Sequence, residues 1–217
     1  MKFHVMVANH SHSKYAESIC QLMNEAAKTR GTGIAKREPA YLRNKMILGH
    51  SIISVINDQV VGFCYIESWE GKKYVANSGL IVHPDYRKTG LAKAIKQATF
   101  NLSKAKFPEA ILFGITTSLA VMKINSDLGY HPVPFSELTK DEAFWKGCQS
   151  CVNHDILKRT NQSMCLCTGM MCSLKHSPTI SPIYVQRTSK QNFIRFLKLQ
   201  KKLVQRKINT TKSKITP

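Results

Sequence analysis

The spacing of apolar residues predicts that the chain begins with a short strand followed by two helices. Apolar and polar residues alternate over residues 3–7, and apolar residues then recur every three or four positions over residues 15–26. Ser11 or Ser13 is the expected N-cap of this first helix. A second, shorter helix is expected over residues 39–48.

Three consecutive antiparallel strands are predicted next, over residues 51–56, 60–69 and 74–82. The first two flank the turn residues Asn57 and Asp58 and form a hairpin, and a second turn at residues 70–72 leads into the third strand. Alternation along the middle strand places Glu67 on the same face as three aromatic residues, Phe63, Tyr65 and Trp69.

The third strand runs into a tight basic loop and a long helix. Pro84 cannot donate a strand hydrogen bond and ends the strand, and Gly90 lets the backbone approach a bulky group closely. Apolar residues then recur on one helical stripe, at Leu91, Ile95, Ala98 and Leu102. Three lysines lie off this stripe, Lys93, Lys96 and Lys104.

A strand, a helix and another strand follow the long helix. Residues 110–115 form a continuous apolar run of the kind that is buried on both faces of a sheet. The helix after it has Gly129 as its C-cap, and a further strand is expected from Tyr130.

The loop at residues 87–92 has the features of an anion-binding site. The first N–H groups of a helix have no partner inside the helix, and the helix dipole adds positive potential at that end. A glycine turn before the helix directs such groups at a ligand, and Arg87 and Lys88 add full charges. The expected ligand carries phosphate, although the glycine spacing matches neither a P-loop nor the dinucleotide fingerprint.

This loop, with the apolar strand and the His-Pro before it, resembles the Arg/Gln-x-x-Gly-x-Gly/Ala loop of the GNAT acyltransferase superfamily. Its residues are Arg87-Lys88-Thr89-Gly90-Leu91-Ala92. The resemblance covers residues 1–135 and implies a GNAT-like α/β (α+β) fold, with a central mixed, mostly antiparallel sheet flanked by helices. It also implies that the loop amides hold the pyrophosphate of acyl-coenzyme A, whose pantetheine arm pairs with the backbone at Ile81 and Val82.

A second match with this family lies at the end of the next helix, where the residues are Asp127-Leu128-Gly129-Tyr130. The resemblance implies that Ser118 and Asn125 flank the arm of the coenzyme. Many family members have a tyrosine at the position of Asn125, where it protonates the leaving thiolate. An amide can donate a hydrogen bond to sulfur but cannot protonate it, so the sequence does not identify the residue that acts as general acid.

Candidate groups for an acceptor amine come from the middle strand and from the loop after the first helix. A carboxylate among aromatic side chains is desolvated, which raises its pKa, so Glu67 is a candidate general base; an exposed strand residue is the alternative. The resemblance places an acceptor-binding loop after the first helix. Arg30, Lys36 and Arg37 either meet an acceptor carboxylate there or belong to a solvated connection.

The charge is distributed unevenly. The 217 residues carry a formal net charge of +19, yet residues 156–217 contain 13 Lys and Arg and no Asp or Glu. We therefore expect a catalytic domain over residues 1–135, a Cys-rich extension over 136–174 that completes the domain, and a basic tail over 175–217 with a short helix. We favour a tail that is disordered or loosely docked; the alternative is a basic arm that contacts nucleic acid, an anionic membrane or an acidic partner.

The seven cysteines and the hydropathy suggest a cytoplasmic chain with reduced thiols. No apolar run reaches the roughly 20 residues of a membrane helix, and no signal peptide is evident. Four cysteines have paired spacings that suit tetrahedral Zn²⁺, and they are Cys148, Cys151, Cys165 and Cys167. Buried free thiols are the interpretation we favour, and a redox pair is a third option.

These observations lead to an expected function. The resemblance implies an N-acyltransferase in which acetyl-CoA is a co-substrate and a small amine is the acceptor. The sequence does not fix the oligomeric state, and a homodimer is one option. The overall pattern most resembles bacterial enzymes that acylate a small amino acid, such as glutamate in arginine biosynthesis. A protein N-acetyltransferase is one alternative, and a non-catalytic basic protein that binds nucleic acid is an alternative of another class.

Overall fold

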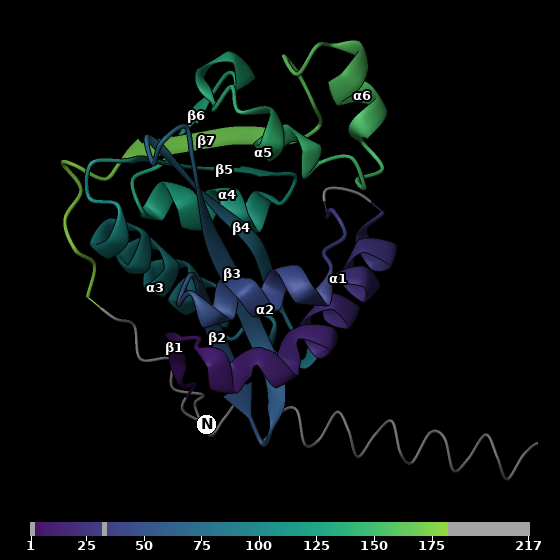
Figure 1. Cartoon of the computed structure of the whole chain (residues 1–217), viewed down its shortest axis with the longest axis vertical. Coiled ribbons are helices and arrows are strands. Elements are labelled where there is room, and N and C mark those ends of the chain that lie inside the picture. The colour runs from purple at the N-terminus through teal and green to yellow at the C-terminus, as the bar shows by residue number, and fades with distance from the viewer. Residues whose placement is uncertain (1–2, 32–33, 182–217) are drawn as a thin grey trace, which may run out of the picture. The chain divides into compact units, whose positions relative to one another are not determined.

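The computed structural model describes residues 3–31 and 34–181, which belong to one compact unit. A sheet of seven strands runs through it in the order β1-β2-β3-β4-β5-β7-β6 (Figure 1). The strands are β1 (Val5–Val7), β2 (Ser51–Ile56), β3 (Gln59–Trp69), β4 (Tyr74–Val82), β5 (Ile111–Thr116), β6 (His131–Val133) and β7 (Thr168–Ser173). The α-helices are α1 (Ala16–Arg30), α2 (Pro39–Ile47), α3 (Leu91–Lys106), α4 (Leu119–Asp127), α5 (Glu142–Lys146) and α6 (His154–Arg159).

The sheet is antiparallel at every junction except the one between β4 and β5, which is parallel. This confirms the predicted fold, a mixed and mostly antiparallel sheet with flanking helices. The turn between β2 and β3 is built on Asn57 and Asp58, whose φ angles are 49° and 59°. Two successive left-handed residues match the twist of an antiparallel pair, which is why this dipeptide forms a hairpin turn.

The predicted start of the first helix was wrong. A 3₁₀ turn, η1 (His10–Tyr15), precedes α1, and its N-cap is Asn9, whose side chain accepts a hydrogen bond from the Ser11 backbone N–H at 3.0 Å. The His12 imidazole in turn accepts from the Asn9 N–H at 3.2 Å, so the two side chains satisfy each other's exposed backbone donors. Tyr15 precedes α1 without a side-chain cap.

Helices cover both faces of the sheet. On one face, α1 and α2 pack against β2 and β3 through an apolar cluster that includes Ile19, Leu22, Leu42, Met46, Ile53 and Phe63. On the other face, α3 and the end of α4 pack through Ile66, Val75, Phe100, Leu112 and Leu128. Successive side chains of a strand point to opposite faces, so Tyr65 joins the first cluster and Ile66 the second.

The segment after β6 returns to the same sheet. β7 inserts between β5 and β6 and pairs with β5 over six residues, from Ile111↔Ser173 to Thr116↔Thr168. Before β7, a 3₁₀ turn, η3 (Phe135–Glu137), and the helices α5 and α6 pack on the sheet through Phe135, Phe144, Trp145 and Leu157. The Phe144 ring meets the Trp69 ring edge-on at 5.8 Å. Because Trp69 shares its face with Tyr65, α5 lies on the same side of the sheet as α2.

The two parallel strands at the centre separate after a short contact. β4 and β5 pair only from Tyr74↔Ile111 to Ala76↔Phe113, although β4 continues to Val82 and β5 to Thr116. On its other side β4 carries a bulge, because Tyr65 pairs with Ser78 while Phe63 pairs with Ile81. Gly79 lies in this bulge with a φ of 66°, a conformation that L side chains rarely adopt.

The basic tail and its expected short helix fall largely on residues 182–217, which lie outside the described residues. Within residues 3–31 and 34–181, no helix combines the length and the apolar character that crossing a membrane requires.

We predict that Gly79→Ala destabilises the fold far more than Gly71→Ala. A Cβ at Gly79 would lie 2.6 Å from a ring carbon of the buried Tyr65, whereas Gly71, with a φ of 61°, has open space around it. Both changes strain a left-handed backbone, at about 1 kcal/mol, but only Gly79→Ala adds overpacking of about 1–3 kcal/mol. Urea unfolding measures the difference, and equal losses for the two variants would contradict this account.

Candidate active site

A cavity of about 550 Å³ lies where β4 and β5 separate. It is lined by the end of α1 and the loop after it, by β3, β4 and β5, by one residue each of α2 and α3, by two residues of α4, and by part of the segment from residue 135 to residue 167. This volume is in the range of pockets for small ligands. The separation of the strands therefore produces a cavity that reaches through the sheet from the α3 side to the α2 side.

The predicted anion loop takes the expected form. Gly90 precedes α3 with a φ of 87°, and Lys88 is also left-handed, at 60°. The backbone N–H groups of residues 88–93 donate to no acceptor in the described part of the chain. The Arg87 Nε donates to the Val82 carbonyl at 3.2 Å and the Thr89 hydroxyl to the Tyr86 carbonyl at 2.6 Å, which hold the loop in place. The loop thus keeps a run of amide donors at the start of a 16-residue helix.

The edge of β4 that faces the separated β5 offers backbone groups. The His83 N–H donates to the Val61 carbonyl at 2.9 Å, so this pair is hydrogen-bonded. Hydrogen-bonded and non-hydrogen-bonded pairs alternate along antiparallel strands, so Val82, opposite Gly62, directs its backbone groups away from β3. By the same alternation, Ile81, the other residue predicted to meet the coenzyme arm, directs its backbone toward β3.

The two residues predicted on and before α4 differ in their surroundings. Asn125 is 2% exposed and lines the cavity; its amide nitrogen lies 3.7 Å from the Met170 sulfur, and its Oδ1 has no hydrogen-bond partner in the described part of the chain. Ser118 is instead the N-cap of α4, where its hydroxyl accepts from the Val121 N–H at 3.4 Å. Its hydroxyl therefore holds the helix, and Ser118 is outside the cavity lining.

Glu67 lies on the cavity wall. The sequence suggested a carboxylate surrounded by aromatic rings alone, but the structure gives it two polar partners. One carboxylate oxygen accepts a hydrogen bond from the Tyr41 hydroxyl, and the other pairs with the Lys45 ammonium. Lys45 is only 6% exposed, so this ion pair is largely shielded from water. Burial and the neighbouring Tyr65 and Glu67 raise the pKa of Tyr41 far above its usual value, which keeps its hydroxyl a donor to the carboxylate.

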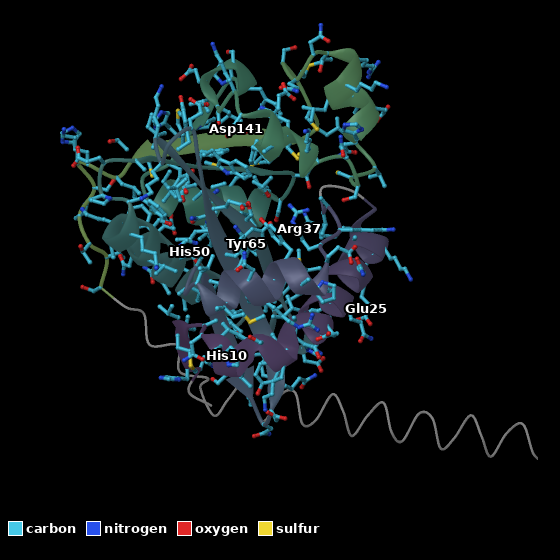
Figure 2. All side chains as sticks on the ribbon, viewed as in Figure 1. His10, Glu25, Arg37, His50, Tyr65 and Asp141 are labelled. Carbon is cyan, nitrogen blue, oxygen red and sulfur yellow. The ribbon has the colours of Figure 1, made fainter. Side chains whose placement is uncertain are left out.

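The structure brings the three predicted basic residues of the loop after α1 into the cavity lining. Arg37 donates from Nε to the Tyr65 hydroxyl at 2.7 Å and from Nη1 to the carbonyls of Lys36 and Gly147 at 2.8 and 3.2 Å. Arg30 donates to the Thr117 hydroxyl at 3.1 Å. Figure 2 shows Arg37 and Tyr65 at the level between α2 and the strands β5 and β7. All of these partners are neutral.

The four cysteines with paired spacing converge on the outer part of the same cavity. Burial, with smaller contributions from the other thiols, raises the pKa of Cys148 to about 11 and that of Cys167 to about 12. Burial favours the neutral thiol, whereas zinc binds thiolate. Among the residues that the structure describes, no group of three or more His, Cys, Asp or Glu is placed to hold a metal ion, so these side chains do not form the zinc site that their spacing left open.

Sequence reasoning missed several polar residues of the site. Tyr41 and Lys45 are one turn apart on α2, so their spacing predicts that they share a face of the helix. It does not predict that Glu67 lies opposite that face. Asn77, in β4, and Lys96, in α3, also line the cavity. Lys96 was expected off the apolar stripe of its helix, yet it is 3% exposed. No local signal marks it, since only the packing of α3 against the sheet buries that position.

The sequence comparisons point to one family. Residues 18–116 match the model of the Acetyltransferase (GNAT) family. Among curated protein sequences, none matches the chain.

Solved structures of acetyltransferases share the fold at low sequence identity. A GNAT family acetyltransferase from Staphylococcus aureus Mu50 gives a TM-score of 0.58 at 13% identity, over 80% of this chain and 99% of that one. A phosphinothricin acetyltransferase of the GNAT superfamily from Sinorhizobium meliloti, solved with AcCoA, gives 0.55 at 14% identity, over 84% and 94%.

N-acetylglutamate synthase from Neisseria gonorrhoeae, solved with coenzyme A and N-acetyl-glutamate, gives a TM-score of 0.56 at 12% identity. The match covers 79% of this chain and 35% of that one, so this chain spans about a third of the length of that enzyme. At such identities, the likeness to these structures shows the fold. This likeness agrees with the match of residues 18–116 to the acetyltransferase (GNAT) family model, and the two together support a GNAT-like acetyltransferase domain.

Proposed function

We propose that this domain is an acyl-CoA-dependent N-acyltransferase that moves an acetyl or other short acyl group to the primary amine of a small amino acid, such as glutamate. One observation carries the proposal: a single cavity joins the separated strands β4 and β5 to a cluster of basic side chains. A thioester donor and an anionic acceptor can meet there without a covalent enzyme intermediate.

The donor would bind along the loop and the edge of β4. The N–H groups of residues 88–93 and the positive end of α3 suit a pyrophosphate. Beyond the loop, the edge of β4 at Val82 has no strand partner among the described strands. Its N–H and the second lone pair of its carbonyl, which also accepts from Arg87, suit the amide groups of a pantetheine arm, which would pair with it as a strand does. The thioester then lies in the cavity, between β4 and β5.

The acceptor end of the cavity favours a carboxylate. In the described part of the chain, Arg30, Lys36 and Arg37 form no ion pair with an acidic side chain. The Trp69 indole N–H, also on the cavity wall, is buried and has no partner among the described residues. A carboxylate bound here would receive charge-assisted hydrogen bonds from these cations. Arg30 and Lys36 are exposed, whereas Arg37 and the Trp69 indole N–H are shielded from water, at least in part, and such bonds are strongest there.

The proposed chemistry is direct attack in a ternary complex. Glu67, held by Tyr41 and Lys45, accepts a proton from the acceptor ammonium, directly or through a water molecule. The amine then attacks the thioester carbonyl, and a backbone N–H on the open edge of β4 stabilises the oxyanion. Collapse of the tetrahedral intermediate breaks the C–S bond and releases the thiolate, and the nitrogen gives its second proton to Glu67, which has passed the first to water. Positioning of the two substrates in one cavity supplies much of the rate.

The acceptor end of the cavity bears on one of the two alternatives. Residues between 143 and 167 line the cavity together with Tyr65 and Glu67, and its volume of about 550 Å³ suits a small molecule. A protein N-acetyltransferase is the second candidate. Nucleic-acid binding would depend on the basic tail, which lies outside the described residues, and the first experiment below separates it from the enzyme.

We predict that Gly90→Glu weakens acetyl-CoA binding by about 30-fold or more, as measured by calorimetry. The added carboxylate repels the pyrophosphate and disturbs several charge-assisted hydrogen bonds, each contributing about 1.5–3 kcal/mol. Gly71→Glu is the matched control, because Gly71 is also left-handed but lies in open space in the β3–β4 turn. Equal affinities for the two variants, or tight RNA binding by a wild type that does not bind acetyl-CoA, would refute the proposal.

We expect Arg37→Gln to raise the KM for an acidic amino acid about 10- to 100-fold and to leave the KM for acetyl-CoA unchanged, since one charge-assisted contact is lost. Lys28→Gln, which removes an exposed charge from the same part of the chain, serves as the control. An acceptor whose carboxylate is replaced by an amide should bind wild type and Arg37→Gln alike. If the variant loses as much affinity for the amide as for the acid, Arg37 does not bind the carboxylate.

The role of Glu67 predicts that Glu67→Gln lowers kcat by about 10²- to 10⁴-fold at neutral pH, the usual contribution of a general base. Glu25→Gln, on the exposed side of α1, makes the same chemical change away from the cavity and should leave kcat unchanged. Steady-state kinetics with saturating acetyl-CoA checks both variants. A kcat within about threefold of wild type for Glu67→Gln would remove this residue from the mechanism.

A further inference from the structure

A buried lysine lies where β4 and β5 separate. Lys96 projects from α3 and is 3% exposed, yet it is part of the cavity lining. Its Nζ donates to the Asn77 Oδ1 at 3.1 Å, and the Tyr130 hydroxyl donates to the same oxygen at 3.1 Å. The Nζ also lies 5.2 Å from the centre of the Tyr130 ring. The ammonium is thus held in place by two neighbouring elements at the edge of the separated strands.

The surroundings of Lys96 contain no carboxylate partner in the described part of the chain. The titratable groups that face it are Cys64 from β3, Cys172 from β7 and Tyr130 after α4. Burial lowers the pKa of Lys96 from its ordinary value of 10.5, and the two thiols oppose this shift. A buried cation without a counter-ion destabilises a fold, so the position calls for a partner that the protein itself does not supply.

The proposed reaction supplies such a partner in its leaving group. The sulfur of the thioester gains negative charge as the C–S bond breaks, and the coenzyme arm would cross the cavity between β4 and β5. Asn125 lines the same cavity, and its backbone carbonyl accepts from the Tyr130 backbone N–H at 3.1 Å, so Asn125 is near the residue whose ring contacts Lys96. An amide can only donate a hydrogen bond to the sulfur, which leaves the proton to come from another group.

We propose that Lys96 is the catalytic residue that protonates the leaving sulfur. This inference rests on the acyltransferase function proposed above. The amine nitrogen forms its bond to the carbonyl carbon, the C–S bond breaks, and its electron pair goes to sulfur. A proton passes from Lys96 Nζ to sulfur and gives coenzyme A thiol and a neutral lysine, which regains a proton from solvent. The acceptor nitrogen loses two protons in all. Glu67 takes the ammonium proton before the attack and passes it to water, and it then takes the second proton from the nitrogen as the intermediate collapses.

The acidities of the Lys96 ammonium and of the coenzyme thiol suit a proton transfer between them. An alkyl thiol has a pKa of about 8.5, and proton transfer is efficient when donor and acceptor have similar values. Burial brings the pKa of Lys96 down toward that of the thiol. The proton must be on Lys96 before transfer, so kcat should fall as the pH rises through the pKa of this group.

Lys96→Met tests the assignment, because methionine has a similar length and no proton to give. We expect kcat to fall by about 10²-fold or more. The high-pH limb of the kcat profile should disappear, while the dissociation constant for acetyl-CoA, measured by calorimetry, stays within about threefold of wild type. The thermal midpoint should be equal or higher, because an apolar side chain replaces a buried charge. Lys104→Met, on the last turns of the same helix, is the control and should leave all four measurements unchanged.

The outcomes separate this inference from the function on which it rests. An active wild type together with a Lys96→Met variant whose kcat is within threefold, or whose high-pH limb is intact, overturns the role of Lys96 alone. A variant that loses acetyl-CoA affinity and thermal stability together with kcat also overturns it, since that pattern indicates a structural lysine. A wild type that acetylates no amine in an acceptor screen overturns both proposals.

Discussion

The separation of two neighbouring parallel strands is the constraint on which the site depends. β4 and β5 pair for three residues and then part, so both strands have backbone groups without a strand partner. A sheet with continuous pairing would bury those groups between strands and leave no cavity. Helices pack on both faces of the sheet, and Gly79 in the bulge of β4 lets the strand bend around the Tyr65 ring.

The acidic and basic groups around the cavity differ in whether they have a charged partner. Glu67, the acidic group of β3, already has a partner in Lys45, whereas Arg37 and Lys96 have only neutral partners among the described residues. Arg37 is on the α2 side of the sheet and Lys96 on the α3 side, so two cations approach the cavity from opposite faces. Such a distribution suits an anionic acceptor on one side and a sulfur that becomes anionic on the other.

The segment after β6 forms one wall of the cavity. By inserting β7 beside β5, it anchors α5 and α6 over the face that carries Tyr65 and Trp69. The aromatic contacts of Phe144 and Trp145 fix this wall against the sheet. The cysteines that suggested a metal site from their spacing belong to this wall, where burial favours the neutral thiols.

The sequence by itself determined the local elements: the Asn57-Asp58 hairpin, the β4 strand, and the glycine loop that begins α3 with open amides. These features depend on residues close in sequence, through backbone sterics and apolar periodicity. It could not determine that Lys45 pairs with Glu67, that Ser118 caps a helix, or that Lys96 is buried. Those facts depend on which side chains from distant segments exclude water from one another, and only the packing of helices on both faces of the separated strands decides that.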